Sequence, residues 1–310
     1  MKYISYINDL FKFNINGLNN FVAFGQNINA GSCLGGLCKD FKQGNRRAII
    51  NTPNTENSLV GLGFGLMLNG TSSAFFMKQQ DFLLLGIDQL VNTHNFIKCQ
   101  QLDSSFSIVN ITMDAGFEGI QSSFNNLYDL CSISGCSGFT ISSKQEADYI
   151  IDTLFYNPGF RIISVSQRLF HSEILDISGG TLISNEETFQ YALGKDLTIA
   201  CFNFSLPQGK QLLDELANSK INASLFSVFG AHNKNYNVII ENAIKTNKLL
   251  IISDSKSYFS NCDFLELQAI RAGVERVKVL KRSVSEDAYS RPNSENFTID
   301  KMSVISNFNL

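Results

Sequence analysis

The sequence of 310 residues lacks several features that would assign it to a common functional class. Its formal net charge is -3, and its Lys and Arg residues are spread along the chain, so it has no basic stripe for binding a phosphate backbone. The N-terminal residues also lack the basic segment, apolar segment and cleavage site of a secretory signal. We therefore expect a cytoplasmic protein that does not bind nucleic acid.

The chain has no apolar run of the roughly 20 residues that a membrane span requires. Its longest candidate, residues 59–68, is interrupted by glycines and ends at Asn69-Gly70. No membrane association is therefore expected.

Seven cysteines are present, and without a secretory signal we expect them to be free thiols. Two pairs, Cys33 with Cys38 and Cys131 with Cys136, are spaced more widely than the usual Cys-x-x-Cys of a zinc ribbon. No histidine follows either pair at ligand distance. The sequence therefore predicts no metal site within this chain.

Hydrophobic residues make up 44% of the chain, which is long enough for two domains that each bury a core. Apolar, β-branched runs alternate with longer amphipathic segments, a pattern typical of parallel strands joined by helices. The predicted class is α/β, with two domains that each contain a mainly parallel sheet flanked by helices. The predicted strands are 21–24, 48–51, 74–77, 107–112, 138–141, 161–165, 197–202, 224–228, 249–253 and 276–280, and the predicted helices are 56–68, 82–97, 122–131, 144–155, 207–218, 237–246 and 263–272.

Residues 176–195 interrupt this alternation, because they contain Gly179-Gly180 and Gly194. We interpret them as the connection between the two domains. The predicted domains are residues 1–180 and residues 190–310.

The segment Asn51-Thr52-Pro53-Asn54-Thr55-Glu56 follows a predicted strand and begins the next helix. Ligand sites of parallel sheets lie beyond the carboxyl ends of the strands, often at helix N-termini. Thr55 could cap the helix, and the negative charge of Glu56 in its first turn would interact favourably with the helix dipole. By position alone, Glu56 could therefore be a purely structural residue.

A longer pattern around this segment resembles a known family. The run NTPNTENSLVGLGFGLMLNG is followed by Phe82 and then by Gly86-Ile87-Asp88-Gln89-Leu90. In order and spacing it resembles the pyrimidine-binding domain of the beta subunits of pyruvate-dehydrogenase-type 2-oxo acid dehydrogenases, which belong to the wider transketolase-like family. Residues 197–282 resemble the C-terminal domain of that family, which serves subunit association.

The resemblance implies that thiamine diphosphate is the cofactor and that Glu56 is the catalytic residue. A hydrogen bond from Glu56 to the pyrimidine ring would favour the imino tautomer, whose exocyclic nitrogen can take a proton from the thiazolium carbon. Phe82 matches the aromatic residue that stacks on the pyrimidine, and an ordinary core phenylalanine stays open as the less favoured alternative. Asn54 matches a position that lines the cofactor cleft, and a core role for it stays open.

The family motif for the diphosphate, Gly-Asp-Gly with a distant Asn, is absent from the chain. The resemblance therefore implies an alpha-type partner chain that holds Mg²⁺ and the diphosphate. The cofactor would lie at the interface of the two chains. A heterotetramer with two chains of each type is the expected assembly.

Two positions depart from the family pattern. Ser122 stands where the dehydrogenases have a histidine used in acyl transfer to lipoamide, and Gln26 replaces a glutamate. A serine hydroxyl cannot replace imidazole as an acid-base group near neutral pH. Three functions therefore stay open: a 2-oxo acid dehydrogenase or decarboxylase, a transketolase-like carboligase without lipoamide, and a structural subunit that has lost catalysis.

Overall fold

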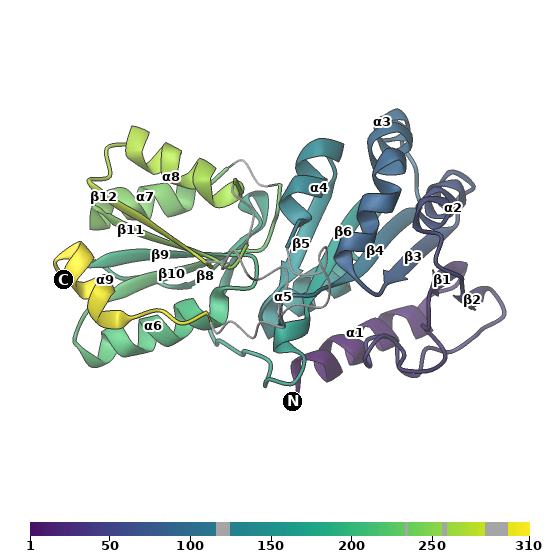
Figure 1. Ribbon diagram of the computed structural model, residues 1–310, viewed down its shortest axis with the longest axis horizontal. Coiled ribbons are helices and arrows are strands. Elements are labelled where there is room, and N and C mark those ends of the chain that lie inside the picture. Colours follow the sequence, from purple (N-terminus) through teal and green to yellow (C-terminus); the bar gives the residue numbers. More distant parts are fainter. Residues whose placement is uncertain (116–124, 233–234, 256–258, 283–296) are drawn as a thin grey trace, which may run out of the picture.

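The computed structural model describes residues 1–115, 125–232, 235–255, 259–282 and 297–310. These residues form two six-stranded sheets that lie side by side, each with helices on both faces (Figure 1). The predicted fold class is thus confirmed. In the described ranges, no helix is both long and apolar enough to cross a membrane.

All six strands of the first sheet are parallel, in the order β2-β1-β3-β4-β6-β5. Its central strands are buried along their whole length, as expected for a parallel sheet covered on both faces. The strands are β1 (Phe21–Gly25), β2 (Arg47–Asn51), β3 (Ser72–Met77), β4 (Ser105–Thr112), β5 (Ser137–Ile141) and β6 (Gly159–Ser166).

Two hydrophobic clusters pack on the two faces of this sheet. One face is covered by α1 (Tyr3–Gly17), α5 (Lys144–Tyr149) and the π-helical η3 (Ile150–Leu154), and the opposite face by α2 (Glu56–Leu68) and α4 (Leu127–Ser134). Between β3 and β4, the predicted single helix 82–97 is instead three short segments: the 3₁₀-helix η1 (Gln80–Gly86), the π-helix η2 (Gln89–Thr93) and α3 (His94–Ile97). Gly86, at the end of η1, packs closely on α2, since a Cβ there would lie 2.8 Å from the Val60 side chain.

The second sheet has the order β12-β11-β9-β10-β8-β7. It is parallel except at one edge, where β8 pairs antiparallel with both β10 and β7. The strands are β7 (Thr181–Ile183), β8 (Thr188–Ala192), β9 (Leu197–Phe202), β10 (Ala223–Val228), β11 (Lys248–Ser253) and β12 (Arg276–Lys281). Strands β7 and β8 lie within residues 176–195, for which no strand was predicted.

Helices α6 (Leu206–Asn218) and α9 (Lys301–Phe308) cover one face of the second sheet, and α7 (Asn237–Thr246) and α8 (Asn261–Arg271) cover the other (Figure 1). The short 3₁₀-helix η4 (Gln167–Leu169) lies between the two sheets, and a second one, η5 (Ser184–Glu186), connects β7 and β8. The largest hydrophobic cluster continues from the first sheet into the second, because it contains Ile163 of β6 and Ile199 of β9. The two halves therefore share a core.

Candidate functional site

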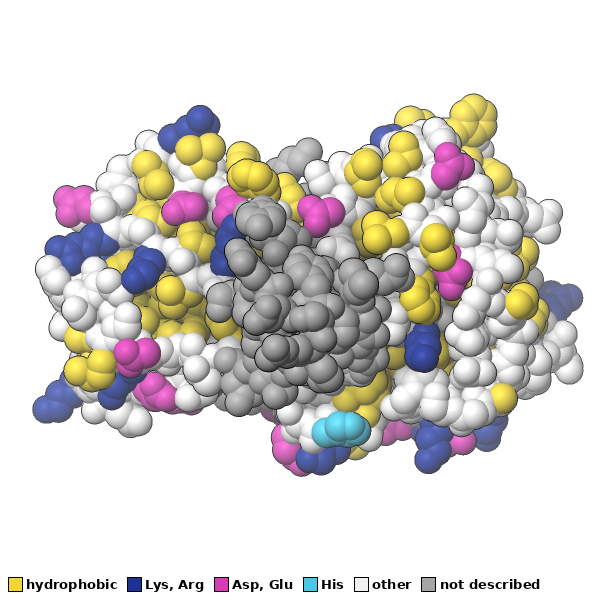
Figure 2. Space-filling model, in the orientation of Figure 1, with side chains coloured by type: hydrophobic (Ala, Val, Ile, Leu, Met, Phe, Trp, Pro, Cys, Tyr) yellow, Lys and Arg dark blue, Asp and Glu magenta, His cyan; other side chains and the backbone are white. Residues whose placement is uncertain are grey.

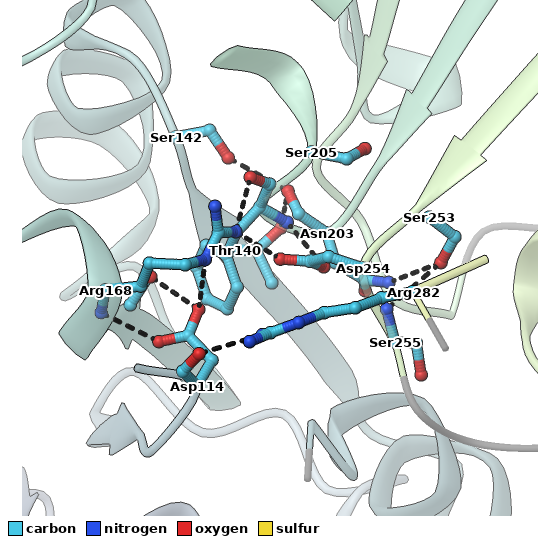
Figure 3. Close-up of polar contacts among 12 residues, drawn as sticks. Asp114, Thr140, Ser142, Arg168, Asn203, Ser205, Ser253, Asp254, Ser255 and Arg282 are labelled. Atoms are coloured by element: carbon cyan, nitrogen blue, oxygen red, sulfur yellow. Dashed lines mark hydrogen bonds and ion pairs between the residues drawn. The ribbon is translucent and has the colours of Figure 1, made fainter. Parts of the chain in front are cut away.

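Polar residues that follow the strands of the two sheets meet between the halves of the molecule (Figure 3). Asp114 and Arg168 follow β4 and β6 of the first sheet, whereas Asp254 and Arg282 follow β11 and β12 of the second. Their contacts show that the carboxyl ends of these strands face one another across the junction. This edge of an α/β sheet is where ligand sites are usually found.

Arg168 is the centre of this network. Its guanidinium lies 2.7 Å from a carboxylate oxygen of Asp254 and 3.7 Å from one of Asp114. The backbone N–H of Arg168 and the hydroxyl of Ser166 also donate to the Asp114 carboxylate, at 2.9 Å and 2.6 Å. The Arg282 guanidinium donates to the backbone oxygen of Asp114 at 2.8 Å.

The network is buried and its charges are matched. Asp114, Asp254 and Arg282 are at most 5% exposed. Burial raises the pKa of the Asp254 carboxyl, and the neighbouring Arg168 opposes this rise. Two guanidiniums offset two carboxylates, and their contacts cross from one sheet to the other. The network therefore serves to join the two halves.

A second polar network lies within the first half, beside η1. The Gln80 amide donates to the Ser164 hydroxyl at 2.9 Å, and its oxygen accepts from the Asn126 backbone at 2.6 Å. Gln80 is fully buried, so it supports the sheet and does not line a cleft. The adjacent Asp81 accepts from the Asn126 side chain at 3.0 Å, and burial raises the pKa of Asp81 to about 7.

The Glu56 carboxylate differs from these carboxylates, because it makes no hydrogen bond or ion pair with the described part of the chain. It occupies the first turn of α2, which follows β2 after a short loop, and it is 8% exposed. Thr55 is the N-cap residue, but its side chain makes no capping hydrogen bond, which corrects the predicted cap. The Glu56 side chain is thus largely buried, but its carboxylate oxygens are not among the fully buried, unpaired atoms. At a helix N-terminus and without a partner in the described chain, this carboxylate is able to hydrogen-bond a ligand.

The other two predicted cofactor residues lie on segments that flank Glu56 in the first half. Phe82 is half-buried in η1, where it packs against the hydrophobic cluster that includes α2. Asn54 is exposed in the loop between β2 and α2. Gln26 directly follows β1, the strand that pairs with β2. Ser122 lies outside the described residues.

The cysteines and other metal-binding side chains do not form a metal centre within the ranges that the structure describes. All seven cysteines are free, and the buried thiols of Cys131 and Cys136 lie 3.9 Å apart. No group of three His, Cys, Asp or Glu side chains in these ranges is arranged to hold an ion.

With two mainly parallel sheets flanked by helices, the chain belongs to the α/β class. No family model matches the sequence, and no curated protein matches it. Among solved structures, a split-gene transketolase described as an inactive beta4 tetramer is similar, with a TM-score of 0.64, 12% identity and coverage of 93% of this chain and 89% of that chain. The transketolase of Campylobacter jejuni subsp. jejuni NCTC 11168 is also similar, with a TM-score of 0.65 and 10% identity.

The chain therefore has a transketolase-like fold. The match to the Campylobacter jejuni enzyme covers 98% of this chain but 44% of that enzyme, so this chain corresponds to less than half of it. Both similar structures are transketolases, whereas the sequence pattern alone resembles the beta subunits of 2-oxo acid dehydrogenases.

Proposed function

We propose that this chain is the beta-type, pyrimidine-binding subunit of a thiamine-diphosphate-dependent enzyme of the transketolase family. The observation that carries this proposal is the state of Glu56, a largely buried residue at the N-terminus of α2 whose carboxylate has no hydrogen-bond partner in the described chain. The fold and the sequence pattern around Glu56 support the same proposal.

The residues around Glu56 would hold one end of this cofactor. Glu56 would hydrogen-bond the pyrimidine ring, Phe82 would stack on it, and Asn54 would line the cleft at the loop that precedes α2. When bound, thiamine diphosphate supplies a carbon nucleophile for reactions at an oxo group. In this chain, Glu56 would hold the pyrimidine in the tautomer that can take up a proton.

The diphosphate and Mg²⁺ would be held by a partner chain, because the sequence has no diphosphate motif. Exposed apolar side chains support such a partner. They belong to the helices that cover one face of the first sheet, and Figure 2 shows several apolar side chains, with polar ones between them, on this half of the molecule. They are Leu62 and Leu68 of α2, Leu84 and Leu85 of η1, Phe96 of α3 and Ile133 of α4.

Within this family, transketolase-like carbon–carbon transfer is the preferred reaction. Both similar structures are transketolases, and Ser122 cannot perform the acid-base step of acyl transfer to lipoamide. Decarboxylation of a 2-oxo acid followed by acyl transfer is the second candidate, favoured by the sequence pattern of residues 51–92. The alpha-type partner would then supply the acid-base groups.

A calorimetric titration of thiamine diphosphate with Mg²⁺ tests this proposal. It is made into the chain alone and into its complex with an alpha-type chain that carries the diphosphate-binding motif. We expect binding to the complex only, and weaker binding when Glu56→Ala is used. Absence of binding to the complex would leave a structural subunit as the better description.

A further inference from the structure

Two buried thiols lie close together at the turn between α4 and β5 (Figure 1). Cys131 lies in the last turn of α4, and Cys136 directly precedes β5. Their sulfur atoms are 3.9 Å apart and share a hydrogen bond. The turn that joins them contains Gly135, whose φ of 66° is in the left-handed region. This left-handed turn ends the helix and brings the two thiols together.

A second pair of cysteines has the same spacing but not the same contact. Cys33 and Cys38 lie in the loop between β1 and β2, and both belong to the described part of the chain. No hydrogen bond joins these two thiols. Cys33 is half-buried, so it is more accessible to a reagent than Cys131 or Cys136. The pair Cys33 and Cys38 is therefore an internal control that separates accessibility from contact between thiols.

Cys136 has the environment of a reactive thiol. It is 2% exposed and is flanked by exposed Gly135 and Ser137, so it lies just beneath the surface. The Ser134 hydroxyl donates to its sulfur at 3.0 Å. The hydrogen bond with the Cys131 thiol lowers the pKa of the Cys136 thiol, and the bond from Ser134 adds to this effect, whereas burial opposes it. Hydrogen bonds to a sulfur favour the thiolate, which is the nucleophilic form of cysteine.

Cys131 has the opposite character. It is fully buried, and a Cβ on Gly138 would lie 2.4 Å from its sulfur, so β5 packs closely on this thiol. The hydrogen bond with Cys136 and burial raise the pKa of the Cys131 thiol well above its usual value. Cys136 is therefore the thiol that reacts first, and Cys131 is held beside it as the second thiol.

We propose that Cys131 and Cys136 are a redox pair that hydrogen peroxide converts reversibly to a disulfide. The Cys136 thiolate attacks a peroxide oxygen, the O–O bond breaks, and the departing hydroxide takes up the proton that Cys136 released, which leaves a sulfenic acid and water. The Cys131 sulfur then attacks the Cys136 sulfur, the S–O bond breaks, and the departing hydroxide takes up the Cys131 proton. The two sulfurs lose two electrons in total, which reduce one peroxide to two waters. This pair does not depend on the thiamine diphosphate proposal.

The test is the oxidation state of each cysteine after the full, folded chain is treated with hydrogen peroxide at neutral pH. Free thiols are blocked with N-ethylmaleimide in urea, disulfides are then reduced, and the released thiols are labelled with iodoacetamide. Peptide mass spectrometry then reads each cysteine separately. We expect Cys131 and Cys136 to become oxidised in parallel, roughly tenfold faster than Cys33 and Cys38. Faster oxidation of Cys33 and Cys38, oxidation of Cys136 without Cys131, or no reducible oxidation of the pair would overturn the proposal.

Variants separate the roles of the two thiols. In Cys131→Ala, which suits the apolar cluster around this side chain, the Cys136 sulfenic acid has no second thiol. It should proceed to the sulfinic acid, which dithiothreitol does not reduce and which mass spectrometry detects as a gain of two oxygen atoms. Thermal denaturation checks the fold, and Cys131→Ser serves as a second variant.

The matched control is Cys33→Ala, at the corresponding position of the other pair. It should form the Cys131–Cys136 disulfide at the wild-type rate, because it leaves the α4–β5 turn unchanged. Reversible oxidation of Cys136 in Cys131→Ala, an unreactive Cys136 in that variant, or a slower disulfide in Cys33→Ala would contradict the assigned roles.

Discussion

The polar groups at the carboxyl ends of the two sheets differ in how they are satisfied. Those of the second sheet are bound within the chain, since Asp254 pairs with Arg168 and Arg282 donates to the Asp114 backbone. Asp114 and Arg168, which follow strands of the first sheet, belong to the same network. The carboxylate of Glu56 in the first half, by contrast, makes no hydrogen bond or ion pair with the described chain. A polar side chain in a largely buried position is normally paired, so an unpaired one suggests a ligand. The comparison separates groups that hold the fold from groups that are available for binding.

The largest effect should come from Glu56→Gln, which tests the carboxylate that has no partner. This change keeps the size of the side chain but removes the acid, so turnover of the complex should fall about 10²- to 10⁴-fold. The free energy of unfolding should change by less than about 1 kcal/mol, because no intramolecular bond is lost. Steady-state assays and urea denaturation measure the two quantities. The control is Glu241→Gln on the exposed face of α7, and a Glu56 variant with full turnover would remove the functional assignment.

Asp254→Ala tests the paired groups of the junction network. It leaves the Arg168 guanidinium without its closest carboxylate at a buried position, so the free energy of unfolding should fall by about 3–5 kcal/mol. Urea denaturation again gives the value. Asp214→Ala, which removes the exposed pair with Lys210 on α6, should cost less than about 1 kcal/mol. An equal loss in the free energy of unfolding for the two variants would contradict the role of the junction network in holding the halves together.

The pH dependence of stability sharpens the comparison at a carboxyl that bridges the halves. Glu146 of α5 accepts from the Ser227 hydroxyl of β10 at 2.6 Å, and burial raises its pKa from 4.5 to about 7. Between pH 4.5 and about pH 7, the folded state holds a proton on Glu146 that the unfolded state has lost. The stabilisation is complete below pH 4.5 and is lost as the pH rises through about 7.

We therefore expect the free energy of unfolding to fall between pH 5 and pH 7 by up to about 1.4 kcal/mol per pH unit from this group. Glu146→Gln should flatten the decline, as measured by urea denaturation at a series of pH values. Burial also raises the pKa of Asp81 and of Glu187 to about 7, so part of the decline should persist. A Glu146→Gln profile parallel to that of the wild type would disprove the assignment.

The smallest effects should distinguish two glycines of α2. A Cβ on Gly63 would lie 2.1 Å from the Phe106 ring, whereas one on Gly65 would meet nothing within 4 Å. Gly63→Ala should therefore lower the free energy of unfolding by about 1–3 kcal/mol. Gly65→Ala should raise it by up to about 1 kcal/mol, because alanine favours a helix. Thermal or urea denaturation of the isolated chain checks both, and similar effects at the two positions would argue against close packing at Gly63.

Much of the fold could be predicted from periodicity. The predicted ranges of α2, α7 and β9 agree with the structure residue for residue. The pair β7 and β8 could not be predicted, because β7 has three residues and follows Gly179-Gly180, which resembles a turn in a connection. The division of residues 82–97 into three short segments was not predicted either, because apolar periodicity does not distinguish an α-helix from short 3₁₀ and π segments.

The candidate site was predicted only in part. The resemblance pointed to Glu56, but its lack of a partner became visible only in the folded chain. The junction residues Asp114, Arg168, Asp254 and Arg282 are far apart in the sequence. The one signal that could have found them is their position, within two residues of a strand end. The sequence does not tell whether a residue at such a position is paired.

The most direct test of the central claim is the rate at which the thiazolium proton of bound thiamine diphosphate exchanges with deuterium in the complex, followed by NMR after acid quench. If Glu56 is held free to act on the cofactor, exchange should be fast in the wild type and slowed roughly a hundredfold or more in Glu56→Gln. Equal exchange rates in the two proteins would contradict the account.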